Sequence, residues 1–102
     1  MKSISINNVS WVVKKKEHFL DRHYQPEEKR AILHYLKQFR PCWFTTAPVV
    51  DPFLGKQAKE ANLGYSDGEY TWYESQIYCL EKYDLALTDE FLAYIRKKLN
   101  MG

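Results

Sequence analysis

The three histidines of this 102-residue sequence are the side chains best suited to metal binding or to proton transfer near neutral pH, because an imidazole does both. Two metal ligands on one face of a helix lie four residues apart, whereas His18 and His23 are five apart and His34 is distant from both. No HExxH or CxxC motif accompanies them. We therefore predict no metal site.

Two cysteines, Cys42 and Cys79, are the remaining candidates for nucleophilic chemistry. Neither lies in a glycine-rich strand-to-helix turn, the setting that exposes the nucleophile of many hydrolases. In a reducing cytosol both are most simply small, buried, apolar side chains. No two of the four glycines have a phosphate-binding spacing, so the sequence predicts no nucleotide and no other cofactor.

Carboxylates are abundant between Asp67 and Glu90, and a pair of them would suit acid–base catalysis if burial separated their pKa values. Structural roles account for them better. Asp67 belongs to a predicted turn, Asp89 and Glu90 to a helix start, and Glu74 to the exposed side of a helix. No catalytic constellation emerges, so we predict that the protein is not an enzyme.

Tyrosine and tryptophan are frequent, with eight and three copies. Both join a large apolar area to a polar tip, which makes them common in protein interfaces. Four aromatic residues are expected inside or half inside the fold: Trp11, Trp43, Trp72 and Tyr83. Tyrosines around the Asp67-Gly68 pair are harder to bury together, because successive hairpin residues face opposite ways. The predicted partner-binding residues lie there: Tyr65, Asp67, Glu69, Tyr70, Tyr73 and Glu74.

Charge is segregated along the chain, although the net charge is only +2. Residues 2–40 hold nine basic and four acidic side chains, whereas residues 67–90 hold seven acidic side chains and one lysine. One interpretation is that the acidic segment attracts a basic partner, because summed surface charge steers association. The other is internal: a basic half and an acidic half face each other or water.

These residues must be positioned by helices and strands. For the segment near the N-terminus, the sequence allows two alternative structures. Residues 4–11 alternate around the pair Asn7-Asn8, as in a short strand or hairpin, but Ser10 would also cap a helix over residues 11–23. A helix is expected over residues 26–40. Pro26 and two following glutamates suit its start, and Pro41 blocks its continuation.

In the middle of the chain, the residue pattern predicts a short strand, a loop, one or two helical turns and a hairpin. Residues 42–46 are rich in strand formers, and residues 48–52 contain two prolines that break the chain into a loop. Residues 56–62 have the composition of one or two helical turns, which Gly64 ends. A hairpin centred on Asp67-Gly68 follows, because this pair favours the positive backbone dihedrals of a tight turn.

Two more helices complete the chain, one over residues 73–82 and one that begins after the capping residue Thr88. Their order with the short strands is mixed and unrepetitive. We therefore predict an α+β fold, with a small antiparallel sheet or hairpin packed with three to four helices, in a single domain over residues 1–102.

The sequence predicts a cytoplasmic protein without membrane contact. No apolar run approaches the roughly 20 residues of a membrane-spanning helix. The first ten residues contain no apolar stretch of the kind found in a signal peptide.

The stretch from Tyr65 to Ile95 contains a distinctive order of residues: Asp67-Gly68-Glu69-Tyr70-Thr71-Trp72, then Tyr78 and Tyr83 in a helix, then Leu85-Ala86-Leu87 and Phe91. This order resembles small bacterial immunity proteins that are encoded beside polymorphic or contact-dependent toxins. The resemblance covers under a third of the chain, and Thr88 stands where a proline is expected. It implies an antitoxin that takes part in contact-dependent growth inhibition through a protein–protein interaction.

Two functional hypotheses follow. In the first, an immunity protein binds a cognate toxin domain, expected to be a nuclease, through residues 67–90, because carboxylates and tyrosine anchors suit a basic groove. In the alternative, a small nucleic-acid-binding or adaptor domain uses the basic N-terminal half. Four interleaved acidic residues weaken that basic patch, so nucleic acid is the less favoured partner.

Overall fold

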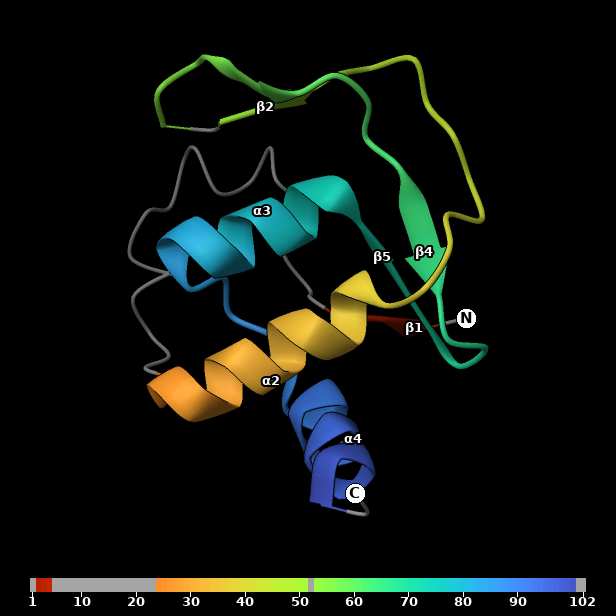
Figure 1. Cartoon of the computed structure of the whole chain (residues 1–102), viewed down its shortest axis with the longest axis vertical. Coiled ribbons are helices and arrows are strands. Elements are labelled where there is room, and N and C mark those ends of the chain that lie inside the picture. The colour runs from red at the N-terminus through yellow and green to blue at the C-terminus, as the bar shows by residue number, and fades with distance from the viewer. Residues whose placement is uncertain (1, 5–23, 52, 101–102) are drawn as a thin grey trace.

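The computed structural model describes residues 2–4, 24–51 and 53–100. Three helices, a three-stranded sheet and a two-stranded sheet lie within them (Figure 1). This confirms the predicted α+β class. The predicted hairpin or helix near the N-terminus falls almost entirely outside the described residues, as do Trp11, His18 and His23.

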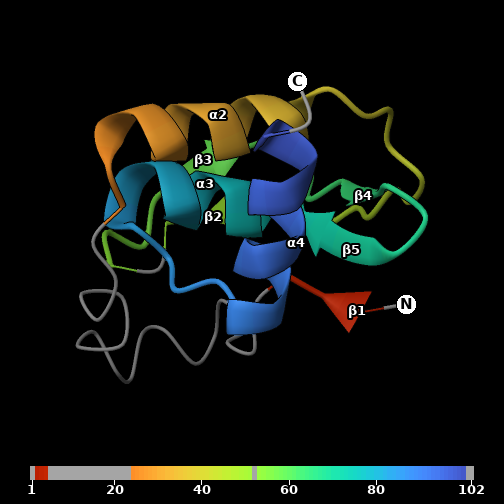
Figure 2. The same ribbon diagram turned by 90° about the horizontal axis from the view of Figure 1, so that it is seen from below.

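The three helices are those predicted, with small differences at their ends. They are α2 (Pro26–Lys37), α3 (Glu74–Tyr83) and α4 (Asp89–Asn100). α2 ends before the predicted residue 40, because a residue that precedes a proline disfavours helical geometry. The Thr88 hydroxyl caps α4, since it accepts a hydrogen bond of 3.1 Å from the Phe91 N–H. α2 and α3 lie side by side, and α4 lies beyond them (Figures 1 and 2).

The three-stranded sheet contains the predicted hairpin and has the order β1-β5-β4. β4 (Gly64–Ser66) and β5 (Tyr70–Tyr73) are antiparallel. Gly68, in the turn between them, has a φ of 101°, which only glycine adopts easily. β1 (Lys2–Ser3) pairs in parallel with β5, so the sheet is mixed and joins the start of the chain to its second half.

A second sheet stands where the sequence predicted a loop and helical turns. β2 (Val49–Val50) and β3 (Gln57–Lys59) are antiparallel. The Asp51 N–H donates to the Lys56 carbonyl, and the Gly55 N–H donates to the Asp51 carbonyl, which closes the turn. The helical turns predicted over residues 56–62 are therefore wrong, because this turn sets residues 57–59 against β2.

The strand predicted over residues 42–46 is reduced to one bridge, between Trp43 and Gly64. Cys42 and Trp43 both direct their N–H groups to the Gly64 carbonyl, and Gly64 returns a hydrogen bond to the Trp43 carbonyl. This segment therefore runs along the outer edge of β4 without continuing as a regular strand.

The core lies between the helices and the three-stranded sheet, with Trp72 fully buried in it. The Trp72 indole N–H donates to the Leu36 carbonyl at 3.2 Å, and the Phe39 ring meets the indole edge-on at 5.6 Å. This confirms the inward placement predicted for Trp72. Buried apolar side chains of the three helices surround it: Ile32, Leu36, Ile77, Leu80, Phe91, Leu92 and Ile95.

Candidate functional site

The predicted partner-binding tyrosines occupy different environments. Tyr65 and Tyr70 are 7% and 2% exposed and belong to the core. Tyr65 also donates its hydroxyl to the half-buried Glu74 carboxylate. Tyr73 is 41% exposed, and Glu69, just before the start of β5, is exposed as well. Of these five predicted residues, Tyr73 and Glu69 therefore present their side chains most openly to solvent.

Asp67, the sixth predicted residue, is a structural centre of the hairpin turn. Its Oδ2 atom accepts hydrogen bonds from the Tyr35 hydroxyl at 2.7 Å and from the Tyr94 hydroxyl at 2.6 Å. Its Oδ1 atom accepts bonds from the N–H groups of Glu69 and Tyr70. Burial opposes ionisation of Asp67, but these four donors outweigh it and lower the pKa of the carboxyl. Asp67 thus fastens the turn to α2 and α4.

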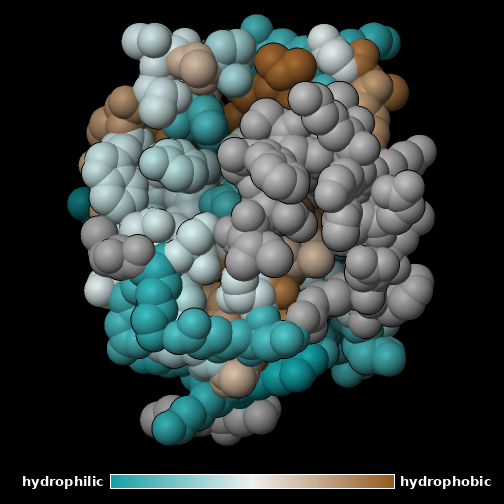
Figure 3. All heavy atoms as spheres, turned by 180° about the vertical axis from the view of Figure 1, so that it is seen from behind, coloured by the Kyte–Doolittle hydropathy of each residue, from teal (hydrophilic) through white to brown (hydrophobic). Residues whose placement is uncertain are grey.

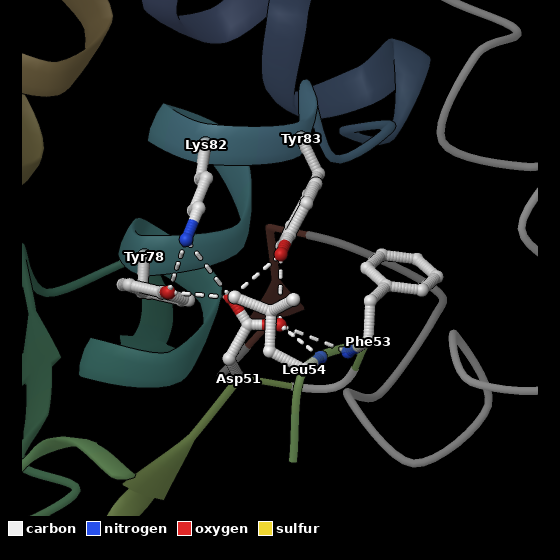
Figure 4. Close-up of polar contacts among 6 residues, drawn as sticks. All are labelled: Asp51, Phe53, Leu54, Tyr78, Lys82 and Tyr83. Carbon is white, nitrogen blue, oxygen red and sulfur yellow. Dashed lines mark hydrogen bonds and ion pairs between the residues drawn. The ribbon is translucent and has the colours of Figure 1, made fainter. Parts of the chain in front are cut away.

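A second carboxylate, Asp51, is 1% exposed and lies at the centre of the cluster in Figure 4. The Tyr78 hydroxyl donates to it at 2.5 Å, and the Tyr83 hydroxyl donates at 2.6 Å. The N–H groups of Phe53 and Leu54 each donate to Oδ1 at 2.9 Å. Burial favours the neutral acid, yet the donors together hold the pKa of Asp51 well below its ordinary value. The buried carboxylate is therefore ionised.

Lys82 compensates the charge of Asp51. Its Nζ atom lies 3.3 Å from Asp51 Oδ2 and donates to the Tyr78 hydroxyl at 3.2 Å. The same ammonium lies 5.6 and 5.7 Å from the ring centres of Tyr78 and Tyr83, within the range of a cation–π contact. Burial and the carboxylate raise the pKa of Tyr83 to about 12, so its hydroxyl remains a donor. The negative charge of Asp51 is balanced by the positive charge of Lys82. The hydroxyls of Tyr78 and Tyr83 donate hydrogen bonds to the carboxylate.

Sequence reasoning treated Asp51 only as part of a loop and missed this cluster. One local signal was available, because an aspartate at the start of a turn commonly accepts bonds from the N–H groups two and three residues later. Tyr78 and Tyr83 lie 27 and 32 residues away from Asp51, and no sequence spacing links them to it.

We call three exposed aromatic side chains the aromatic surface: Trp43 and Tyr73, together with Phe44, which follows Trp43 in the chain. Trp43, Tyr73 and Phe44 are 38%, 41% and 76% exposed. The inward or half-inward placement predicted for Trp43 is therefore wrong, because this residue lies along the outer edge of β4. Trp43 and Tyr73 converge over Gly64: a Cβ atom there would lie 2.7 Å from Trp43 Cε3 and 3.1 Å from Tyr73 Cε1. Tyr73 faces away from the core because it alternates with the buried Trp72. Trp43 and Tyr73 therefore lie on the outer side of the sheet.

Further apolar side chains are exposed on the second sheet. Val50 and Leu54 are 42% and 58% exposed. Figure 3 shows apolar side chains at the top of the molecule, over this sheet and beside polar ones. Val50 lies in β2 and Leu54 in the turn that follows it, so both belong to a different element from Phe44 and provide a comparison for it.

The two cysteines differ, which corrects part of the sequence prediction. Cys79 is fully buried, and burial raises the pKa of its thiol to about 12, so it is an unreactive core residue as predicted. Cys42 is exposed, and its predicted burial is wrong. It lies on the outer edge of β4, where none of the described elements covers it.

Ion pairs join the basic first part of the chain to the acidic segment. Among the described residues, three such pairs connect them: Lys2–Glu90 at 2.6 Å, Lys29–Asp84 at 2.6 Å and Lys37–Glu81 at 2.8 Å. The internal interpretation of the charge order accounts for these contacts. Acidic residues that meet basic ones within the fold are less available to steer a partner.

Neither a metal centre nor a membrane span is found in the described part of the chain. No three His, Cys, Asp or Glu side chains are grouped there so as to hold a metal ion. No helix there has the length and apolar character needed to cross a bilayer.

Comparison of the chain with known protein families, with curated proteins and with solved structures found no match. Any functional inference therefore depends on the surface and on the clusters described above.

Proposed function

We propose that this protein is an immunity protein that binds a cognate toxin domain and blocks it, and that the aromatic surface is the centre of the contact. The observation that carries the proposal is the exposure of Trp43, Phe44 and Tyr73, whereas the other aromatic side chains in the described part of the chain are buried or half-buried. Exposed tryptophan and tyrosine supply much of the binding energy in protein interfaces. Adjacent exposed apolar side chains are typical of interaction sites.

The residues predicted from the sequence contribute to this surface in two ways. Tyr73 belongs to it directly, and Glu69 places an exposed carboxylate at the other end of β5. The buried rings of Tyr65 and Tyr70 instead support the hairpin that carries both. The proposal therefore keeps Tyr73 and Glu69 as contacts and adds Trp43 and Phe44.

The choice of a toxin as the partner is supported by the resemblance of residues 65–95 to immunity proteins. Glu69 suits a partner with a basic groove, such as a nuclease, because opposite charges accelerate association. The nucleic-acid alternative has less support, because three lysines in the described part of the basic half, Lys2, Lys29 and Lys37, are engaged in ion pairs.

The proposal is tested with the C-terminal domain of a toxin encoded next to this gene. We expect the two proteins to co-purify, and co-expression to protect cells from the toxin. Phe44→Ala and Tyr73→Ala should each weaken binding about tenfold or more in calorimetry, the scale of an interface hot spot. Neither change should alter the chemical denaturation midpoint much, because both side chains are exposed.

Leu54→Ala is the matched control, because it removes an apolar side chain that is 58% exposed on the second sheet. It should leave the affinity for the toxin unchanged. Glu69→Lys tests the charge of the partner and should slow association most at low salt. Full affinity of both Phe44→Ala and Tyr73→Ala would rule out the aromatic surface, and absence of any complex would rule out the immunity function.

A further inference from the structure

Strands β2 and β3, together with residues 51 and 53–56, form a segment across α3 that we call the strap (Figure 1). The strap has two strands of two and three residues. A two-stranded hairpin this short is marginal in water, so its position depends on contacts with the rest of the fold. Those contacts fall into two groups, at its base and at its turn.

The base of the strap is fixed to the body of the protein. The Asn62 N–H donates to the Ala47 carbonyl at 2.9 Å, which holds the two ends of the strap together. The Thr45 hydroxyl donates to the Asn62 carbonyl, and the Asn62 side chain accepts a bond from the Ser75 N–H at the start of α3. These bonds do not involve the strap itself and would persist if it moved.

The turn of the strap is held chiefly by Asp51. Its carboxylate accepts bonds from Tyr78 and Tyr83 and lies beside Lys82, and all three belong to α3 (Figure 4). Bonds of this kind, with an ionised acceptor, are about twice as strong as neutral ones. The Phe53 ring adds an edge-on contact with Tyr83, at 4.6 Å between ring centres.

Apolar burial along the strap is small. Val49 is 2% exposed and is the buried apolar residue of the two strands, whereas Val50 and Leu54 face solvent. Within the described residues, the apolar attachment of the strap is limited to Val49 and to the half-buried Phe53, beside the polar attachment through Asp51. A segment with these properties is expected to open locally before the core unfolds.

We propose that the strap detaches from α3 as a unit, with Asp51 as its latch and the Ala47–Asn62 pair as its hinge. Opening releases the half-buried hydroxyls of Tyr78 and Tyr83, and the already exposed ammonium of Lys82, from the Asp51 carboxylate. This inference does not depend on the proposed toxin partner.

Hydrogen exchange of the full chain, followed residue by residue, tests the proposal with Asp51→Asn. The backbone N–H groups of β2 and β3 are the reporters, because they do not donate to the Asp51 side chain. They should exchange about tenfold faster in the variant, while those of β5 and α3 keep their rates, because only the latch is weakened. Equal acceleration in the strap, β5 and α3 would instead show global unfolding and overturn the proposal, as would unchanged rates in the strap.

Asp67→Asn is the matched control, since Asp67 accepts two tyrosine hydroxyls and two backbone N–H groups in the same way. It should leave exchange in the strap unchanged. Tyr83→Phe removes one hydrogen-bond donor to Asp51 and keeps the ring. It should therefore accelerate hydrogen exchange in the strap alone, by a smaller factor than Asp51→Asn does. If Asp51→Asn does not fold, Tyr83→Phe decides the question: unchanged strap exchange in that variant overturns the proposal.

Discussion

At the scale of single residues, hydrogen bonds from tyrosine hydroxyls to carboxylates recur throughout this protein. Among the described residues, five tyrosines donate in this way, two to Asp67, two to Asp51 and one to Glu74. A buried carboxylate stays ionised only when donors replace the water it loses, and a phenol supplies a donor together with apolar area. The high tyrosine content is thus largely a property of the interior, and Tyr73 is the tyrosine left for a surface role.

These carboxylates predict a loss of stability in acid. The pKa values of Asp51 and Asp67 are both lowered from their ordinary 3.8, so the folded state binds fewer protons than the unfolded state. The stabilisation is complete above about pH 5 and falls as the pH drops through 3.8 toward the folded-state values. Urea midpoints measured from pH 7 to pH 2 should follow this course.

Asp51→Asn should reduce the fall of the urea midpoint at acid pH, because the amide does not titrate. The variant will be less stable than the natural protein at pH 7, and the difference should shrink as the pH falls. A constant difference over the whole range would contradict the assignment of Asp51 as an ionised group.

Gly64 is predicted to be required for the arrangement of the aromatic surface. In Gly64→Ala the new Cβ atom would lie 2.7 Å from Trp43 Cε3, so the indole must shift. Overpacking of this kind costs about 1–3 kcal/mol of stability. Denaturation of the two single variants and of the double variant with Trp43→Ala measures the coupling, because removal of the indole should relieve most of the cost. An equal cost with and without Trp43 would show that the glycine acts through the backbone alone.

At the scale of secondary-structure elements, the end of α3 combines a backbone constraint with an ion pair. Asp84, the C-cap residue, has a φ of 58° and lies 2.6 Å from Lys29 on α2. Aspartate and asparagine tolerate this left-handed conformation, whereas β-branched residues do not. The ion pair is partly exposed, so its contribution is expected to be small.

Substitutions at Asp84 should separate these two effects. Asp84→Asn keeps the backbone conformation and loses the ion pair, at a cost of less than about 1 kcal/mol. Asp84→Val loses both and should cost roughly 1–2 kcal/mol more, because of the left-handed backbone. Chemical denaturation of both variants gives the two costs, and equal stability of the two would show that the backbone conformation at this position changes freely.

At the scale of the whole molecule, Trp72 links the sheet to the helices. The indole is fully buried, donates to the Leu36 carbonyl and contacts the ring of Phe39. Trp72→Ala should cost roughly 3–5 kcal/mol, the usual effect of truncating a buried aromatic side chain. That is a large part of the 5–15 kcal/mol that stabilises a typical domain. An unchanged denaturation midpoint would contradict the central position of Trp72.

The sequence by itself determined the elements that arise from local interactions. Pro26 starts α2, Asp67-Gly68 closes the β4–β5 turn and Thr88 caps α4, and each acts on residues within a few positions of itself. The inward side of Trp72 also follows from strand alternation. These features were predictable because the interactions that stabilise them are made between residues only a few positions apart.

Only the tertiary structure decided which side chains are buried, paired or exposed. Asp51 meets Tyr83 across 32 residues, Trp43 lies on Gly64 and leaves Phe44 in solvent, and Lys2 reaches Glu90 across 88 residues. The second sheet replaced the helical turns predicted over residues 56–62 for the same reason, since its turn is anchored to α3 through Asp51. Such contacts arise when the whole chain buries its apolar surface, and the position of each partner depends on the packing of every element between them.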